Sequence, residues 1–365
     1  MRRDLTWPVL VGWTTAVGLT HVVGPSAVSW HSFVRGTRAL LSPAAAHLYA
    51  LHSALQIGPV AYLADAPIVL GLPGPAGRVA AMAAMSMLGL LVVAQLERLA
   101  RPADRAAQWR FVVAAMALLL VWEQLAITYV HPDDALALLL ALIALRLVRA
   151  DRPLLAALLL ALAADSKPWA LAFVPILALA RTRRGLAVLV WVAGVAAAWL
   201  PFYLLDPRST AATTFRIRNV ATSSLRILGV HTGWTPSWDR PVQITLGAAL
   251  ALLVVRRERW PAVILVAVCA RLLLDPSTKS YYDAGLLVGS MLCDLLLVAG
   301  PVPLFSLSAL LLFSAPRAVL GEEPHFYGQL RTAYLLAVIG VLLIPRRWSQ
   351  VAGAQGPTPE IRSTA

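Results

Sequence analysis

The stretch LAADSKPWALAFVP, from Leu162 to Pro175, interrupts a long apolar run with three polar residues. The run covers residues 154–180 and is flanked by two basic sequences, RADR before it and RTRR after it. Pro168 lacks an amide hydrogen and disfavours helix at Lys167. The sequence therefore predicts two half-helices that meet near residues 165–168, with both basic ends on one side and the polar tip on the other.

The composition of the whole chain is typical of an integral membrane protein. Of its 365 residues, 59% are hydrophobic and 13% are charged, and the mean hydropathy is +0.73. A soluble domain has about a quarter of its residues charged. The apolar runs lack the alternation of barrel strands, so they predict helices, and a broken helix is tolerated where it lines a wet cavity. We therefore expect an all-α polytopic membrane protein.

Ten apolar runs are candidate membrane spans, although several are shorter than the roughly 20 residues of a full crossing. They cover residues 7–24, 79–97, 111–130, 135–148, 186–204, 241–255, 260–274, 284–299, 304–320 and 333–345. With the broken, re-entrant pair and amphipathic segments on the outer face, they predict a single membrane domain over residues 1–348. The polar residues 349–365 predict a disordered cytoplasmic tail. A cleaved signal peptide is the alternative to an uncleaved first span.

Arginine sets the predicted orientation, because short cytoplasmic loops carry an excess of basic residues. The net charge is +13, and with the N-terminus inside, most arginine groups between the spans fall on the cytoplasmic side. This predicts a multi-pass protein of the plasma (inner) membrane with both termini in the cytoplasm. The segments 25–78, 131–134, 205–240, 275–283 and 321–331 then lie outside. Nucleic acid is not an expected partner, because no basic stripe with interleaved aromatic residues lies outside the apolar runs.

The sequence HPDD at residues 131–134 supplies the candidate catalytic residues, Asp133 and Asp134, with His131 beside them. An Asp pair at a helix start caps the helix and suits its dipole. One Asp suffices as a cap, so the second can hold a cation, act as a base or position a substrate hydroxyl. Adjacent Asp residues are not the spaced carboxylates of a metal site, so no metal is predicted.

Basic residues on the same side are candidates for binding a phosphate. Lys167 either meets a phosphate as a point charge or forms a structural pair with Asp165. The loop 205–240 contains five arginines. Either long outer loops are exempt from the preference of basic residues for the cytoplasmic side, or these arginines bind an anion. The predicted phosphate-binding residues are Lys167, Lys279, Arg216 and Arg218. The other predicted cavity residues are His131, Asp165, Trp30, Tyr49, Gln56 and Tyr282.

Several stretches together resemble the polytopic GT-C glycosyltransferases, specifically the family-87 mannosyltransferase-like membrane proteins of actinobacteria. They are WHSFVRGTRALL, HLYALHSALQIGP, HPDDALALLL, DSKPWALAFVP, SSLRILG, PSWDRPVQI and RLLLDPSTKSYYDAGLL, and they span about residues 28–290. The resemblance implies a GT-C-like fold and inverting hexosyl transfer from a polyprenyl-phosphate sugar, usually mannose, to a glycolipid or glycan of the cell envelope. It implies no nucleotide and no other cofactor.

The resemblance also implies a general base in the first outer loop, an Asp just before the Trp of WHSF, and basic loop residues around the leaving phosphate. This chain has Ser29 at that position. Either Asp133, Asp134 or Asp65 takes the role, or the protein is a catalytically inactive relative. A transporter or flippase for a lipid-linked anion is a further alternative, although the paired broken helices typical of transporters are not evident.

Overall fold

A computed structural model of the chain describes residues 5–214, 216–316 and 324–344. In this part of the chain the regular elements are helices, and an isolated bridge between Arg218 and Trp234 is the one β-type pairing. The prediction of an all-α protein is therefore confirmed. The predicted tail, residues 349–365, lies outside the described residues, as do the last residues of the predicted span 304–320.

The helical elements follow one another along the chain with short connections. They are α1 (Thr6–Val22), α2 (Trp30–Leu40), η2 (Ala45–His47), α3 (Leu48–Leu51), α4 (Pro59–Gly71), α5 (Gly74–Ala100), α6 (Arg105–Glu123), η3 (Gln124–Tyr129), α7 (Pro132–Arg149), α8 (Pro153–Ser166), η4 (Pro168–Leu179), α9 (Arg184–Leu205), η5 (Pro207–Thr214), α10 (Ser224–Ile227), α11 (Asp239–Arg256), η6 (Trp260–Ala262), α12 (Val263–Leu273), η7 (Ser280–Tyr282), α13 (Asp283–Leu296), α14 (Leu304–Ser308), η8 (Ala309–Ser314) and α16 (Pro324–Leu343).

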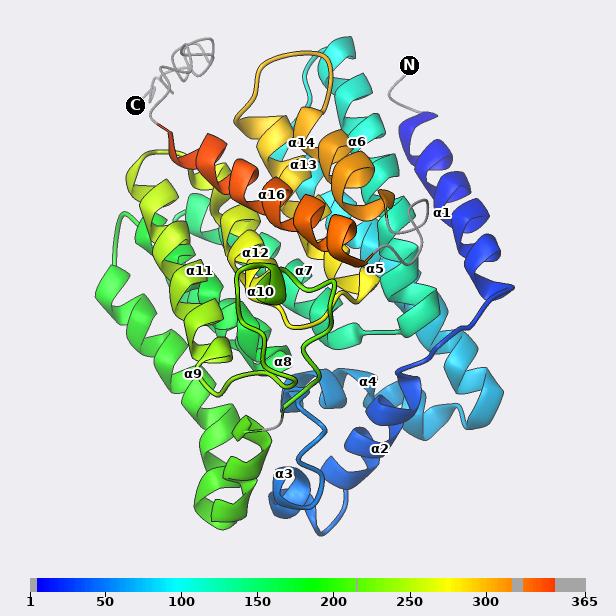
Figure 1. The fold of residues 1–365 in the computed structure, drawn as a ribbon, viewed down its shortest axis with the longest axis vertical. Helices are drawn as coiled ribbons and strands as arrows, with labels where there is room; N and C mark the ends of the chain where they lie inside the picture. The colour runs from blue at the N-terminus through cyan, green and yellow to red at the C-terminus, as the bar shows by residue number, and fades with distance from the viewer. Residues whose placement is uncertain (1–4, 215, 317–323, 345–365) are drawn as a thin grey trace, which may run out of the picture.

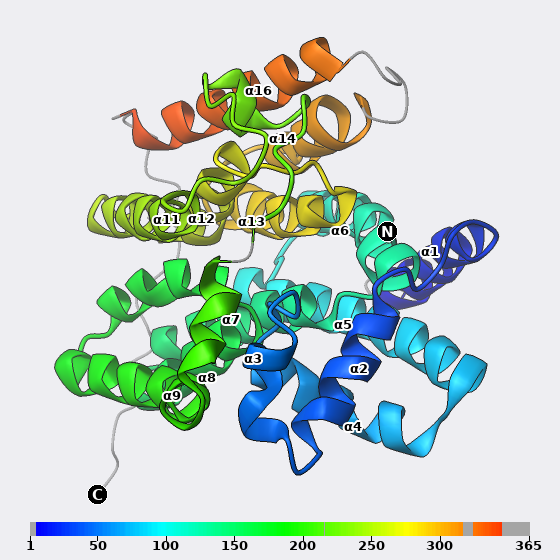
Figure 2. The same ribbon diagram turned by 60° about the horizontal axis from the view of Figure 1, so that its bottom comes forward.

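The helices stack in layers around α12 and α13. Figure 2 shows α11, α12 and α13 in a row, with α16 on one side and α7, α8 and α9 on the other. Every residue of α12 is buried, and this helix packs against α11, α13 and α16. A helix that is apolar all round needs such cover on every side. At one end of the molecule, α2, α3 and α4 lie together beside the C-terminal part of α9 (Figure 1).

Among the described residues, four helices are long and apolar enough to cross a membrane: Gly74–Ala100, Arg105–Tyr129, Arg184–Leu205 and Phe326–Leu343. Five shorter apolar helices accompany them, so helix length alone does not establish the ten predicted crossings. The helix α9 packs one face on α8, but few of its residues are fully buried, and Leu204 is 71% exposed. An apolar helix exposed in this way is suited to contact with lipid rather than water.

The break predicted in the opening stretch is confirmed. The helix α8 ends at Ser166, Lys167 is extended with φ −145° and ψ 114°, and the 3₁₀ segment η4 begins at Pro168. The two halves pack against each other. The amide of Gly58 donates to the carbonyl of Ser166 at 3.0 Å, and a Cβ at Gly58 would lie 1.7 Å from the carbonyl oxygen of Asp165. The tip of the hairpin is therefore fixed by a close backbone contact at position 58, where only glycine fits.

Candidate functional site

The predicted catalytic aspartates begin α7 directly after a distorted helix end. The segment η3 is π-helical, and Val130 after it has φ +53°, which is strained for a β-branched residue. The carbonyls of residues 127–129 accept hydrogen bonds from the amides of residues 27–29, at 2.8, 3.0 and 3.0 Å. π-Helical turns and strained backbone occur frequently at functional sites. Here they bring Ser29, just before α2, next to His131.

Asp133 is completely enclosed, with a side chain that is 0% exposed. Its Oδ1 accepts a hydrogen bond from the backbone amide of Asp134 at 2.9 Å and lies 3.1 Å from Nδ1 of His131. Its Oδ2 is bound by the ammonium of Lys167. A buried carboxylate is tolerated when it is paired and hydrogen-bonded in this way. These contacts hold Asp133 as a carboxylate in one position.

Asp134 occupies the other side of the same helix start. Its Oδ1 accepts hydrogen bonds from Nε1 of Trp169 at 2.9 Å and from the guanidinium of Arg271 at 3.1 Å, and its Oδ2 lies 3.4 Å from Nζ of Lys167. The guanidinium of Arg271 lies 4.4 Å from the ring centres of both Trp169 and Tyr282. Asp133, Asp134, Lys167 and Arg271 thus form a charge cluster in which two carboxylates face two cations.

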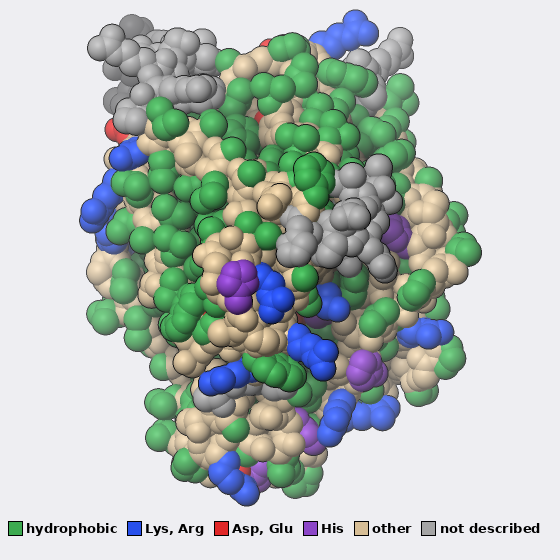
Figure 3. Space-filling view, in the orientation of Figure 1, with side chains coloured by type: hydrophobic (Ala, Val, Ile, Leu, Met, Phe, Trp, Pro, Cys, Tyr) green, Lys and Arg blue, Asp and Glu red, His purple; other side chains and the backbone are tan. Residues whose placement is uncertain are grey.

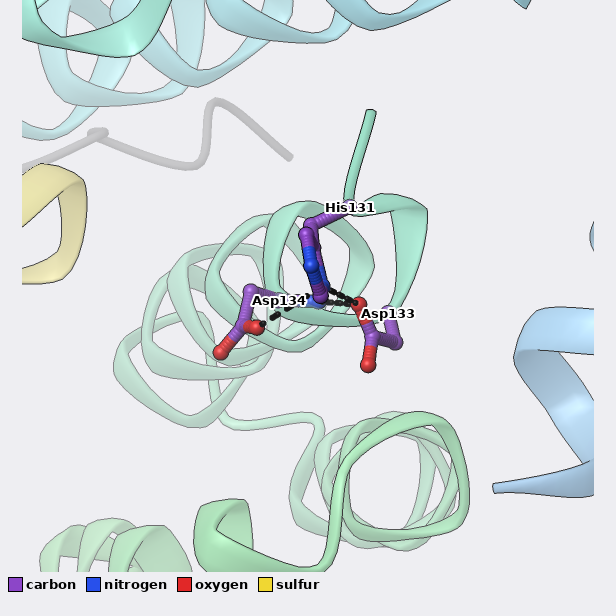
Figure 4. A group of neighbouring side chains, drawn as sticks. All are labelled: His131, Asp133 and Asp134. Carbon is purple, nitrogen blue, oxygen red and sulfur yellow. Dashed lines mark hydrogen bonds and ion pairs between the residues drawn. The ribbon is translucent and has the colours of Figure 1, made fainter. Parts of the chain in front are cut away.

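His131 connects this charge cluster to α2. Its Nε2 lies 2.9 Å from Oγ of Ser29, and its Nδ1 lies 3.7 Å from Oδ2 of Asp134 in addition to its contact with Asp133. The imidazole stacks on Tyr281 with ring centres 4.0 Å apart, and the ring of Phe33 meets it edge-on at 5.6 Å. Figure 4 shows the imidazole and the two carboxylates converging at the start of α7. The carboxylate of Asp133 places the ring proton on Nδ1, because Nδ1–H can donate to it.

The same three side chains offer ligand atoms within 4.8 Å of one another, which is close enough for a metal ion. The two carboxylates are, however, already neutralised by Lys167 and Arg271. A divalent cation would stand beside an ammonium group and would have to displace it. The chemistry of these residues therefore fits an internal ion-pair network better than a metal centre.

No protein-family model matches the sequence, and no curated protein matches it either.

The remaining predicted cavity residues lie around the hairpin tip and α2. Trp30 is buried and stacks on Phe33 with ring centres 6.4 Å apart. The hydroxyl of Tyr49 donates to the carbonyl of Ile57 at 2.8 Å, and its ring stacks on Trp199 at 5.2 Å. The side chain of Asp165 is buried. The amide of Gln56 donates to the carbonyl of Ala212 at 2.6 Å and so joins the first predicted outer loop to the loop 205–240.

The predicted phosphate-binding residues fall into two groups. Lys167 belongs to the charge cluster, whereas Arg216, Arg218 and Lys279 are exposed on loops. These loops meet, because the amide of Val220 donates to the carbonyl of Pro276 at 2.9 Å. Figure 3 shows Lys, Arg and His side chains gathering over α10 and the segment below it in the view. The loop cations form an exposed positive surface, apart from the buried cluster.

Titratable groups in the loop that precedes α13 are strongly affected by burial. Burial raises the pKa of Asp275 to about 6, although the positive charge of Arg271 opposes the shift. Burial also raises the pKa of Tyr282 to about 12, and the charge of Asp275 adds to this effect. Tyr282 therefore keeps its proton at neutral pH, whereas Asp275 changes its charge a little below neutrality.

Two cations do not pair with the carboxylate nearest to them in the sequence. The ion pair of Lys167 is with Asp133 and not with Asp165, because residues two apart do not face each other at a helix end. The hydrogen bond of Arg271 goes to Asp134 on another helix, although Asp275 lies only four residues away in the sequence. Trp169, Tyr281 and Phe33 were not predicted as site residues. These three residues could have been found from the sequence, because they lie inside the stretches SKPW, KSYY and WHSF, which already contain or adjoin predicted site residues.

Proposed function

We propose that this chain is a membrane glycosyltransferase that moves a sugar, mannose in the first instance, from a polyprenyl-phosphate donor to a lipid or glycan acceptor at the outer face of the plasma membrane. The observation that supports it is a convergence of the stretches that carry the GT-C resemblance. HPDD supplies the two carboxylates, and SKPW supplies Lys167 and Trp169 to bind them. RLLLDPSTKSYYD supplies Arg271 and Tyr281, and Phe33 of WHSF packs on His131.

The chemistry of sugar transfer needs an activated acceptor hydroxyl and a stabilised leaving phosphate. Asp133 and Asp134 are enclosed, so they act on the acceptor indirectly, by orienting His131. The ammonium of Lys167 has three N–H donors, of which two face the carboxylates, so one is left for a phosphate oxygen. The exposed cations Lys279, Arg216 and Arg218 extend the positive field toward an anionic donor.

The proposed membrane placement rests on the apolar helices. The exposed apolar surface of α9 suits contact with the bilayer. The start of α1 and the end of α16 lie at the same end of the molecule, opposite α2 and α3 (Figure 1). This supports both termini on the cytoplasmic side, with the loops around α2 and α3 outside.

A transfer assay tests the proposal. Membranes that contain the protein are incubated with labelled polyprenyl-phosphate mannose, and label in new glycolipid or glycan is followed. We expect transfer by the parent and a loss of about tenfold or more in an Arg216→Gln, Arg218→Gln double variant, because charge-assisted bonds to phosphate are lost. The matched control is Arg181→Gln with Arg183→Gln, two exposed arginines of a predicted cytoplasmic loop. If the folded parent transfers no polyprenyl-phosphate sugar, the proposal fails.

A second candidate is a catalytically inactive relative that binds the donor without transferring the sugar. It is favoured by the full neutralisation of both carboxylates by Lys167 and Arg271, which leaves neither as a free base. This candidate predicts donor binding, measured with the same labelled lipid, and no labelled product.

A further inference from the structure

Ser29, His131 and Asp133 form a continuous chain of polar contacts at the edge of the charge cluster. Oγ of Ser29 lies 2.9 Å from Nε2 of His131, and Nδ1 of His131 lies 3.1 Å from Oδ1 of Asp133. A hydroxyl, an imidazole and a carboxylate in this order activate the hydroxyl on many unrelated folds, independently of sequence position.

Each member of this chain is held by other parts of the fold. Asp133 is fixed by Lys167 and by the amide of Asp134. The imidazole is held between Tyr281 and Phe33. The backbone amide of Ser29 donates to the carbonyl of Tyr129 at 3.0 Å. The arrangement is therefore built by contacts that do not depend on the Ser–His bond itself, which is what preorganised chemistry requires.

Exposure decides which member a substrate can reach. Asp133 is 0% exposed, so a substrate hydroxyl cannot approach it directly. Ser29 is only partly buried. With the ring proton on Nδ1, the lone pair of Nε2 faces Ser29 and accepts its hydroxyl proton. The accessible end of the chain is thus the hydroxyl of Ser29.

We propose that His131 is the base of the reaction and that Ser29 conducts the proton to it, an inference that rests on the proposed sugar transfer. The acceptor oxygen bonds to the anomeric carbon while the bond from that carbon to the phosphate oxygen breaks. The proton of the acceptor moves to Oγ of Ser29, and the former proton of Ser29 moves to Nε2 of His131. The polyprenyl phosphate leaves with the bonding electron pair, and Asp133 and Asp134 stabilise the imidazolium until it releases its proton to water.

The first experiment measures the activation of Ser29 without any sugar. The purified protein in detergent is treated with a small alkyl fluorophosphonate, which reacts with a hydroxyl whose proton is taken by a base. The Ser–O–P bond forms, fluoride leaves and the proton goes to His131. Mass spectrometry locates the adduct. We expect labelling of Ser29 that falls about a hundredfold or more in His131→Gln, because that is the usual contribution of a general base.

The chain contains a matched control for this labelling. Oγ of Ser32 lies 3.3 Å from Nε2 of His31, but that pair is exposed and Nδ1 of His31 faces the carbonyl of Val28 at 3.0 Å in place of a carboxylate. We expect no labelling of Ser32, and no effect of His31→Gln on Ser29. The comparison of Ser29 with Ser32 in the parent stays informative if His131→Gln does not fold.

The second experiment repeats the transfer assay with Ser29→Ala, for which we expect a loss of about a hundredfold. Labelling of Ser29 without transfer by the parent would support the activated hydroxyl and overturn the sugar transfer. Transfer by a parent whose Ser29 is not labelled, or labelling of Ser29 that is unchanged in a folded His131→Gln, would overturn the role of His131 and leave the transferase standing. Neither labelling nor transfer would overturn both.

Discussion

The ion pair between Lys167 and Asp133 allows a quantitative prediction. The substitution Lys167→Met preserves the length of the apolar stem of lysine and removes the ammonium. The fully enclosed Asp133 is then left without its counter-ion. Breaking a buried pair in this way costs about 3–5 kcal/mol. Asp133 keeps its contacts with His131 and the amide of Asp134, so we expect a loss near the lower limit. That is about a hundredfold in the ratio of folded to unfolded protein.

The two cysteines supply the assay. Cys269 and Cys293 are free and buried, so a dye that fluoresces on reacting with thiols reports unfolding in detergent. Lys279→Met is the matched control for stability, because Lys279 is the other lysine of the chain and is exposed. Loss of an exposed charge changes stability by less than about 1 kcal/mol. We expect Lys167→Met to expose the cysteines at a clearly lower temperature, and Lys279→Met to follow the parent.

A second substitution separates the charge from the shape of Lys167. Adding Asp133→Asn to Lys167→Met removes the uncompensated charge, so the double variant should recover much of the lost stability. Identical melting curves for Lys167→Met and Lys279→Met would refute the assignment of a buried ion pair. A double variant that loses the sum of the two single losses would show that the two residues act independently.

Two further predictions concern the hairpin tip and the loop before α13. Gly58→Ala should lower the melting temperature, because its Cβ would lie 1.7 Å from the carbonyl oxygen of Asp165, whereas Gly71→Ala meets nothing within 4 Å; equal melting of the two variants would contradict this contact. Burial raises the pKa of Asp275 from 3.8 to about 6, so the folded protein binds this proton more tightly than the unfolded chain. Its stabilisation is complete below about pH 4 and is lost as pH rises through about 6. Melting followed by tryptophan fluorescence should show this decline in the parent and a weaker one in Asp275→Asn, and parallel declines would disprove it.

Local rules predicted the features that depend on neighbouring residues. Pro168 and the polar residues before it indicated the break at Lys167. The position of Asp133 and Asp134 in the first turn of a helix agrees with the helix dipole, but the expected Asp cap was wrong, because His131 is the residue at the N-cap. The all-helical class followed from composition. The number of crossings did not follow in the same way, because 3₁₀ and π-helical segments such as η4 and η8 divide apolar runs that look continuous in the sequence.

Ion pairs and hydrogen bonds between residues far apart in the sequence could not be predicted from local rules. Lys167 binds Asp133, which is 34 residues away in the sequence, and Arg271 donates a hydrogen bond to Asp134, which is 137 residues away. Those pairings depend on how α7, α8 and α12 pack, and the sequence shows only that each helix is apolar. The nearest opposite charge in the sequence was therefore a poor guide for both cations.

The charge cluster gives a physical reason for a serine at position 29. Asp133 and Asp134 are balanced by Lys167 and Arg271, so the cluster carries no net charge while the imidazole of His131 is neutral. A carboxylate at position 29 would add a third negative charge beside His131, would favour the imidazolium and would remove the free lone pair on Nε2. A hydroxyl adds no charge and leaves that lone pair available. Ser29 and the neutralised aspartates are thus parts of one arrangement, in which the imidazole and not a carboxylate is the group free to accept a proton.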